Sequence, residues 1–377
     1  MDVNVLVKKL NSDFYTGVPD SQLKALCDYL IDSFEISEQH IIAANEGNSV
    51  ALAAGYYLAT GKIPVVYMQN SGIGNIINPV VSLLNEKVYG IPCIFIIGWR
   101  GEPEVDDEPQ HIFQGEISRK LLEEIGLYTV ILNKNTMVEE LEKEVMEAHH
   151  ILKQNRSVAF LVRRNSLSYD KQITYENPYV ITRESAIEHI INIADQDVIV
   201  STTGKASREV FEIREKKGQG HQFDFLTVGS MGHSSSIALG IALNKQNIKV
   251  WCIDGDGAML MHMGAMAVIG NRCPENLVHI VINNEAHESV GGLPTVSSGI
   301  NLGKIAEGCG YPNIASVETY EKLDKELFIA KKRKALSFIE IKCAIGSRED
   351  LGRPKTTAYE NKEIFMKYLK SIISDNK

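Results

Sequence analysis

The chain has 377 residues, 44% hydrophobic and 23% charged, which is an ordinary globular composition long enough for two domains of roughly 150 residues each. A net charge of −9 disfavours a nucleic-acid-binding protein, which usually carries a basic face, and no apolar run approaches the ~18 residues of a membrane span. The N-terminus lacks a secretion signal and the six cysteines form no CxxC pair, so we expect a cytoplasmic protein with reduced thiols and no nucleic-acid or membrane partner.

Strands alternate with helices along the first half of the chain. The predicted elements are a helix at 3–10, a strand and turn at 14–21, a helix through 23–30, a strand at 40–44, a helix through 50–58, strands at 64–68 and 91–97, a polar loop at 101–114, helices at 121–126 and 136–154, and a strand at 158–162. This alternation predicts a parallel sheet with helices on both faces.

The second half repeats the pattern after an aperiodic stretch. Its predicted elements are a helix at 185–194, a strand at 198–201, a helix through 210–213, a strand at 225–228, a helix from 234, a strand at 250–253, a helix after 257, strands at 277–282 and 337–343, and a helix at 362–373. We expect two similar doubly wound domains, at 1–170 and 184–377, joined by a linker at 171–183 and with no middle domain.

Two polar clusters follow neighbouring apolar runs in the second half. Gly255-Asp256-Gly257-Ala258 follows the strand at 250–253, and Asn283-Asn284 follows the strand at 277–282. Ligands of open α/β sheets bind beyond the carboxyl ends of such strands, so the two clusters should face one crevice. Carboxylate and amide oxygens suit Mg²⁺, and the amides of a following helix favour a diphosphate. Loop chemistry alone explains either cluster, but the pair is more specific.

The two halves also align with each other. Shifting the first half by 250 − 65 = 185 residues places 44–72 on the second half without a gap, so that Gly47 meets Gly232 and Val65 meets Val250. The shared order of strand, helix and strand favours two copies of one fold. Glu46 falls opposite Met231 in this register, and therefore the copies have diverged at the strand ends, where binding residues sit.

The spacing from Asp256 to Asn283, 283 − 256 = 27, resembles the cofactor motif of thiamine diphosphate-dependent enzymes. The resemblance implies thiamine diphosphate and Mg²⁺ as cofactors. It assigns the metal to Asp256, to one asparagine of the pair and to a backbone carbonyl two residues later. The second asparagine, Asn284, with Ala286 as the carbonyl donor, is favoured over Asn283. Gly255, Gly257 and Ala258 complete the diphosphate motif.

The same resemblance implies that the first half of the chain binds the aminopyrimidine ring of the cofactor. It implies that Glu46 contacts the pyrimidine ring nitrogen and that Met231, within Gly229-Ser230-Met231, is the bulky apolar residue that holds the cofactor bent. From the residues alone, Glu46 is equally a helix-start carboxylate and Met231 a packing residue. The family unites these groups across a subunit interface, which implies a homodimer or higher homo-oligomer.

Three further segments resemble the two-domain phosphonopyruvate decarboxylases, with sulfopyruvate decarboxylases close behind. They are 16–21, 101–111 and 284–292, and they contain the candidate catalytic residues Asp20, His111 and His287 besides Glu46. The implied reaction is non-oxidative decarboxylation of 3-phosphonopyruvate to phosphonoacetaldehyde and CO₂, in phosphonate biosynthesis. A ketoacid carboligase of the acetolactate synthase type is a further alternative. Arg100, Lys205 and Arg208 are candidate cations for the phosphonate or sulfonate of the 2-keto acid.

Overall fold

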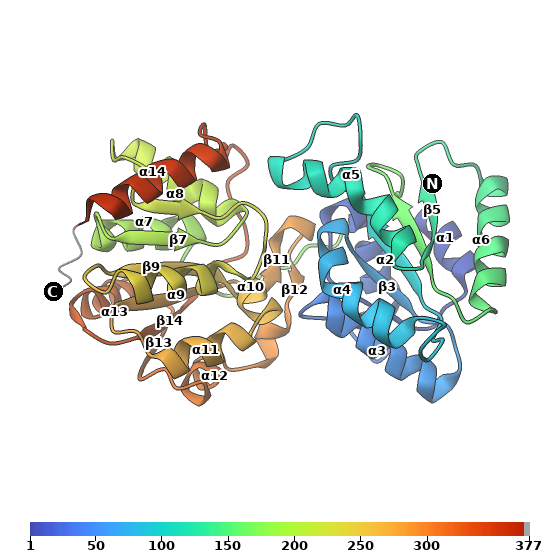
Figure 1. Ribbon diagram of the computed structural model, residues 1–377, viewed down its shortest axis with the longest axis horizontal. Coiled ribbons are helices and arrows are strands. Elements are labelled where there is room, and N and C mark those ends of the chain that lie inside the picture. Colours follow the sequence, from blue (N-terminus) through green and yellow to red (C-terminus); the bar gives the residue numbers. More distant parts are fainter. Residues whose placement is uncertain (373–377) are drawn as a thin grey trace. The chain divides into compact units, whose positions relative to one another are not determined.

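The computed structural model describes residues 1–372, which divide into two compact units (Figure 1). Unit 1 comprises Met1–Thr174 and His287–Leu293, and unit 2 comprises Tyr175–Ala286 and the chain from Pro294 onward. Each unit contains a six-stranded parallel sheet, and the described residues hold no third domain between the two. The predicted class, two similar doubly wound parallel sheets, is confirmed.

Unit 1 has the strand order β2-β1-β3-β4-β6-β5. Its elements are α1 (Val3–Leu10), β1 (Tyr15–Gly17), η1 (Ser21–Leu23), α2 (Lys24–Phe34), β2 (His40–Ile42), α3 (Glu46–Thr60), β3 (Val65–Gln69), η2 (Asn70–Gly72), α4 (Ile73–Pro79), η3 (Val80–Leu84), β4 (Ile94–Gly98), α5 (Pro109–Glu124), β5 (Tyr128–Leu132), α6 (Val138–Leu152) and β6 (Val158–Val162).

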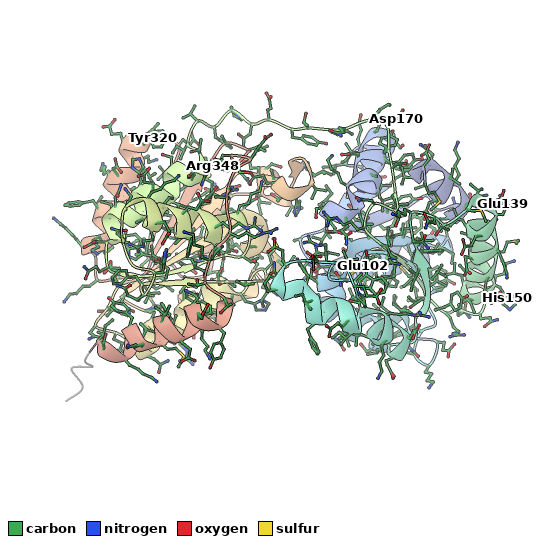
Figure 2. All side chains as sticks on the ribbon, turned by 90° about the horizontal axis from the view of Figure 1, so that it is seen from above. Glu102, Glu139, His150, Asp170, Tyr320 and Arg348 are labelled. Atoms are coloured by element: carbon green, nitrogen blue, oxygen red, sulfur yellow. The ribbon has the colours of Figure 1, made fainter. Side chains whose placement is uncertain are left out.

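Helices cover both faces of the unit 1 sheet, as its apolar strands require. Alternate residues of β3 and β4, such as Val66 and Phe95, form one core with apolar side chains of α3, α4 and α5. The other face carries α1, α2 and α6 (Figure 1). The polar side of α6 is turned outward, where Glu139 and His150 project into solvent (Figure 2).

Unit 2 has the strand order β13-β14-β10-β9-β7-β8. Its elements are α7 (Arg183–Ala194), β7 (Val198–Ser201), α8 (Lys205–Lys216), β8 (Asp224–Leu226), α9 (Ser234–Asn244), β9 (Val250–Gly255), α10 (Asp256–Met261), α11 (Gly264–Arg272), β10 (Leu277–Asn283), η5 (Val296–Gly299), α12 (Leu302–Gly308), β13 (Asn313–Val317), α13 (Tyr320–Lys332), β14 (Ser337–Lys342) and α14 (Ala358–Ser371). The short β11 (Ala286–His287), η4 (Glu288–Val290) and β12 (Leu293–Pro294) follow β10.

The two faces of the unit 2 sheet differ in polarity. Trp251 and Ile253 of β9 join an apolar core with α7, α8 and α13. The side chains of β9 that alternate with them, Cys252 and Asp254, face the opposite layer, where α9 and α11 lie (Figure 1). This second face therefore carries polar groups inside the fold.

The structure confirms the internal repeat. Read from its β2 or β8 edge, each sheet has the same order, so β2-β1-β3-β4-β6-β5 corresponds to β8-β7-β9-β10-β14-β13. The offset of 185 residues carries the start of β3, Val65, onto the start of β9, Val250, and carries β5 (Tyr128–Leu132) onto β13 (Asn313–Val317). Two copies of one domain therefore account for both sheets.

Several predicted boundaries were wrong or incomplete. The predicted loop at 101–114 ends earlier, because α5 begins at Pro109, whose fixed φ suits the first turn of a helix. The helix predicted at 121–126 is only the end of α5. Strands β5 and β13 and helices α12 and α13 were not predicted. The predicted terminal helix corresponds to α14, and its last predicted residue, Ile373, lies outside the described residues.

Two findings bear on the environment of the protein. Among the described residues, no helix combines the length and apolarity needed to cross a bilayer. All six cysteines carry free thiols, and four of them, Cys27, Cys93, Cys252 and Cys343, are buried. Cys273 is exposed and Cys309 is half-buried.

Candidate active site

The predicted diphosphate motif lies where β9 ends and α10 begins. Gly255 closes the strand with an ordinary extended conformation, φ −107°, so the backbone does not need glycine there. A Cβ at Gly255 would meet no atom of residues 1–372 within 4 Å, so the glycine leaves open space in front of the strand end. Since α10 has only six residues, the amide groups of its first turn, and not a long helix dipole, are what this end of the helix could offer to a ligand.

Asp256 is the first residue of α10 and is 3% exposed. Its Oδ2 accepts hydrogen bonds from the Thr295 hydroxyl at 2.5 Å and the Ser297 hydroxyl at 2.7 Å. Burial raises the pKa of the Asp256 carboxyl, and these two hydroxyls oppose that rise. The carboxylate is thus oriented by donors from the segment that leads into η5. Neither donor was predicted from the sequence, although a Thr-x-Ser pair in a loop is a recognisable source of such contacts.

Asn283, at the end of β10, is completely buried, and both polar atoms of its side chain have hydrogen-bond partners. Its Nδ2 donates to Glu340 Oε1 at 2.7 Å, and its Oδ1 accepts from the Glu285 amide at 3.0 Å. The Ser297 hydroxyl lies 3.1 Å from the same Oδ1. Asn283 therefore links β10 to β14, and its oxygen accepts from the Glu285 amide and lies beside Ser297, the residue that also contacts Asp256.

Asn284 belongs to the same loop and is 7% exposed. Its Oδ1 accepts from the Ala286 amide at 3.2 Å, which orients the side chain along its own turn. Its backbone carbonyl accepts from Asn177 Nδ2 at 2.9 Å. Because Asn283 is committed to structural contacts, Asn284 is the better of the two candidates for a metal ligand.

The donors at this edge fit the metal that the family motif implies. An ionised Asp256 and the amide oxygen of Asn284 are hard oxygen donors, and Mg²⁺ prefers one or two such ligands together with phosphate oxygens and water. The Ala286 carbonyl follows two residues after Asn284 in the same turn. The hydroxyls of Thr295 and Ser297 fix the carboxylate, as supporting groups do at metal sites.

The predicted Met231 loop packs against this same helix. Gly229, Ser230 and Gly232 have positive φ values of 71°, 47° and 86°. A Cβ at Gly232 would lie 2.8 Å from the Ala258 carbonyl oxygen, so the loop approaches α10 at a distance that only glycine allows. Unit 2 therefore brings half-buried Met231 to the strand edge that carries Asp256.

In unit 1, Glu46 is the first residue of α3 and is 4% exposed. Asn75 Nδ2 donates to Glu46 Oε2 at 2.7 Å. Burial raises the pKa of the Glu46 carboxyl, with the Asn75 amide acting in the opposite direction. A Cβ at Gly72 would lie 2.6 Å from the Glu46 carboxyl carbon, so Gly72 leaves the space that this side chain fills. Glu46 is a buried carboxyl whose proton is easily retained.

Asp20 lies just after β1 and is 2% exposed. Its Oδ1 accepts from Gln69 Nε2 at 2.7 Å, and the Gln69 Oε1 in turn accepts from the Ser71 hydroxyl at 2.8 Å. A Cβ at Gly98 would lie 2.0 Å from Asp20 Oδ2, so β4 also depends on glycine beside this carboxyl. Burial raises the pKa of Asp20, while Gln69 and the charge of Arg100 lower it.

The turn after β3 connects these two carboxyls. Gln69 contacts Asp20, and Gly72 packs against Glu46. Between them, Asn70 Nδ2 donates to the Arg100 carbonyl oxygen at 2.8 Å and its Oδ1 accepts from the Arg100 amide at 3.0 Å. The sequence analysis did not single out Gln69 or Asn70. Their position at a strand end, like that of Asp256 in the other half, is the signal that identifies them.

His111 and Arg100 lie at the same end of the unit 1 sheet. His111 is half-buried on α5, and both its burial and the positive charge of Arg100 lower its pKa. The Arg100 guanidinium forms a two-point ion pair with Asp107, in which Nε donates to Oδ2 at 2.7 Å. Arg100 is therefore largely neutralised by Asp107 before any anionic substrate arrives.

His287 groups with unit 1, although it follows β10 in sequence. The segment His287–Leu293 packs on this unit, where a Cβ at Gly291 would lie 2.9 Å from the Ile173 carbonyl oxygen. Burial lowers the pKa of His287 to about 4, which leaves the imidazole neutral at physiological pH. All four predicted catalytic residues, Asp20, Glu46, His111 and His287, thus belong to unit 1.

The other two candidate cations are on α8 of unit 2. Lys205 Nζ donates to the Ser347 hydroxyl at 2.5 Å, and Arg208 is half-buried. Ser347 is followed by Arg348 (labelled in Figure 2). Arg348 forms ion pairs with Glu184 and Glu212. This corner of unit 2 is therefore charge-balanced by its own side chains.

Comparison with known proteins agrees with this geometry. Residues 3–122 match the thiamine pyrophosphate enzyme N-terminal TPP binding domain, and residues 202–341 match the C-terminal TPP binding domain of the same enzymes. The chain belongs to the thiamine pyrophosphate enzyme family.

Curated relatives narrow the comparison. The chain is 32% identical to a phosphonopyruvate decarboxylase of Streptomyces viridochromogenes, over 91% of this chain and 88% of the relative. It is 30% identical to a phosphonopyruvate decarboxylase of Streptomyces hygroscopicus, over 91% and 87%. A sulfopyruvate decarboxylase of Methanosarcina acetivorans is 27% identical, over 89% of each.

Proposed function

We propose that this protein is a thiamine diphosphate- and Mg²⁺-dependent carboxy-lyase that converts 3-phosphonopyruvate to phosphonoacetaldehyde and CO₂, a step of phosphonate biosynthesis. The observation that carries the proposal is full-length similarity, at 30–32% identity, to two phosphonopyruvate decarboxylases. The buried carboxyls of Glu46 and Asp256, which the proposal assigns to the two ends of the cofactor, support it further.

The residues have distinct roles in this proposal. Asp256, Asn284 and the Ala286 carbonyl would hold Mg²⁺, and Gly255, Gly257 and Ala258 would lie beside the diphosphate. Met231, on the loop Gly229-Ser230-Met231, would give the cofactor an apolar contact. Thiamine diphosphate, when bound, supplies the electron sink that allows a 2-keto acid to lose CO₂.

Glu46 would hold the aminopyrimidine end of the cofactor and would hold or release a proton at its own carboxyl. Its burial suits this role, because a carboxyl that retains its proton more readily than usual is poised closer to neutral pH. Asn75 keeps the carboxyl in place and limits how far its pKa rises. Asp20, His111 and His287 orient the keto acid or transfer protons to the product, with Gln69 fixing the carboxyl of Asp20.

We further propose a cytoplasmic homodimer or higher oligomer in which Glu46 and Asp256 of different subunits complete one active site. Six free thiols support a reducing compartment. Large apolar side chains exposed on the single chain support association, and they include Leu58, Tyr89 and Phe113 of unit 1, at 71%, 71% and 69% exposure. Light scattering on the purified protein measures the subunit number directly.

Sulfopyruvate decarboxylation is the second candidate, supported by the Methanosarcina relative. The deciding experiment offers phosphonopyruvate, sulfopyruvate and pyruvate in parallel to the full chain with thiamine diphosphate and Mg²⁺, and follows aldehyde and CO₂. We expect the highest kcat/KM with phosphonopyruvate. A higher value with sulfopyruvate would reassign the substrate, and a ketol product in place of aldehyde would make the protein a carboligase.

A further inference from the structure

Unit 2 contains a buried polar cluster on the sheet face that α9 and α11 cover. Cys252 and Asp254 alternate on β9, and His279 of β10 lies directly opposite Cys252 in the strand register. All three side chains are completely buried. Trp251 and Ile253 point into the apolar core on the other face, so the cluster is enclosed by the sheet on one side and by helices on the other.

Two atoms of this cluster face each other without a hydrogen bond. His279 Nε2 and Asp254 Oδ2 are 3.5 Å apart, and neither has a hydrogen-bond partner within residues 1–372. Their companion atoms are satisfied, since Asp254 Oδ1 accepts from the Gly255 amide at 3.0 Å and His279 Nδ1 lies 3.1 Å from the Tyr311 hydroxyl. Buried polar atoms without partners destabilise a fold, so these two atoms call for a ligand that satisfies both.

We propose that Cys252, Asp254 and His279 bind a transition-metal ion, preferably Zn²⁺, at a site separate from the Mg²⁺ site at Asp256. The three candidate ligand atoms, a sulfur, a carboxylate oxygen and an imidazole nitrogen, lie within 4.8 Å of one another. Tetrahedral Zn²⁺, with bonds of about 2.0–2.3 Å, holds its ligand atoms roughly 3–4 Å apart, so small side-chain movements close the site.

The chemistry of the donors selects zinc over magnesium. A thiolate and an imidazole are soft or borderline ligands that suit Zn²⁺, whereas Mg²⁺ takes oxygen. Zn²⁺ with one thiolate and one carboxylate carries no net charge, which an enclosed site requires. The Tyr311 contact orients the imidazole so that Nε2 points at the cluster, as supporting groups do at zinc sites. The Ser234 hydroxyl lies close to the Cys252 thiol.

The test uses cobalt as a spectroscopic probe, because only a thiolate ligand produces an intense charge-transfer band with Co²⁺. The full chain is produced in cobalt-supplemented medium, since an enclosed site must be filled during folding. A Cys273→Ser, Cys309→Ser background removes the exposed and half-buried thiols. We expect stoichiometric cobalt that survives dialysis against excess Mg²⁺, together with the thiolate band. The Asp256 site cannot produce that band, because its donors are oxygens.

Matched variants assign the ligands. Cys252→Ala and His279→Gln should lose the band and the tightly held metal, whereas Cys343→Ala, at another buried thiol of unit 2, should keep both. X-ray absorption of the zinc-loaded protein needs no variant and should show one sulfur at about 2.3 Å. A protein that folds in the presence of cobalt or zinc yet retains neither metal would overturn the proposal. Asp254 and His279 would then share only a proton. Retention of the band in Cys252→Ala would overturn it equally.

Discussion

Gly72 and Glu46 are so close that a Cβ on the glycine would lie 2.6 Å from the carboxyl carbon of the glutamate. The carboxyl proposed to contact the aminopyrimidine is therefore positioned by the absence of a side chain on the turn after β3. The same turn fixes Asp20 through Gln69, so one short segment sets both carboxyls of unit 1.

Gly72→Ala should displace Glu46 and reduce kcat by about 100-fold or more, because a misplacement of about 1 Å in a catalytic group has that effect. Gly74→Ala is the matched control, since a Cβ there meets no atom of the described chain within 4 Å. Steady-state kinetics and thermal unfolding of both variants separate the two effects. Equal activity in Gly72→Ala and Gly74→Ala would show that the position of Glu46 does not matter.

Asn75→Ala should change the pH profile in a defined direction. Burial raises the pKa of Glu46 and the Asn75 amide lowers it, so removing the amide raises the pKa further. The ionised form of Glu46 is then lost at a higher pH, and the acid limb of kcat/KM should move to higher pH. Asn78→Ala, at an exposed residue of the same helix, should leave the limb in place. A shift to lower pH would contradict the assignment.

The same pKa shift affects stability with a fixed sign. A carboxyl whose pKa is raised by folding stabilises the folded state below its unfolded pKa, and this contribution is lost as the pH rises through the folded pKa. Glu46→Gln, without cofactor, should therefore be more stable than the parent protein at pH 7, and the difference should shrink as the pH falls from the raised folded pKa toward the unfolded value of about 4.3, below which it should stay constant. Chemical unfolding at several pH values measures this difference in the free energy of unfolding. A difference that grows toward acid pH would contradict the destabilising effect assigned to the ionised Glu46 carboxyl.

Ser297→Ala should weaken Mg²⁺ binding by about 10–100-fold, the usual effect of removing a group that orients a metal ligand. The reason is the loss of the 2.7 Å hydrogen bond to Asp256 Oδ2, one of the two hydroxyl contacts that hold this carboxylate. Ser298→Ala removes only a 3.5 Å contact to the Thr295 carbonyl oxygen and is the control. Calorimetric titration of Mg²⁺ with thiamine diphosphate present measures the change, and equal affinities in the two variants would exclude the role of Ser297.

Asp224→Asn should destabilise unit 2 by about 3–5 kcal/mol, because it leaves the completely buried Arg214 guanidinium without its ion pair. Glu363→Gln, at an exposed pair with Lys362, should change stability by less than about 1 kcal/mol. A Trp99→Phe background leaves Trp251 of unit 2 as the only tryptophan, so its fluorescence follows unfolding of this unit. Similar unfolding midpoints for both variants would contradict the prediction.

The repeat explains how much of the fold was predictable. An offset of 185 residues fixed the correspondence of the two halves, because glycine and apolar positions at strand ends persist in both copies. Strands β5 and β13 were missed, and they are corresponding strands at one edge of each sheet. In β13, half-buried and solvent-exposed side chains alternate up to the buried Val317. The strand therefore lacks the apolar run that is typical of a central strand.

Individual residues of the candidate site were predictable from the sequence, but their hydrogen-bond partners were not. Asp256 and Glu46 could be placed at strand ends from the sequence. Their partners could not, because Thr295 is 39 residues from Asp256 along the chain and Asn75 is 29 residues from Glu46, and no local pattern joins them. The family resemblance already favoured Asn284 over Asn283, and the contact of Asn283 with Glu340, a feature of the folded sheet, adds an independent reason for that choice.

The central claim is that Glu46 and Asp256 serve opposite ends of one cofactor, and Glu46→Gln tests it most directly. Turnover of phosphonopyruvate and calorimetric binding of Mg²⁺ with thiamine diphosphate are measured on the same preparation. The account predicts that turnover falls by at least about 100-fold while binding stays within about 10-fold of the parent protein, because the substituted amide cannot exchange the proton but Asp256 still holds the metal. Normal turnover by Glu46→Gln would contradict it.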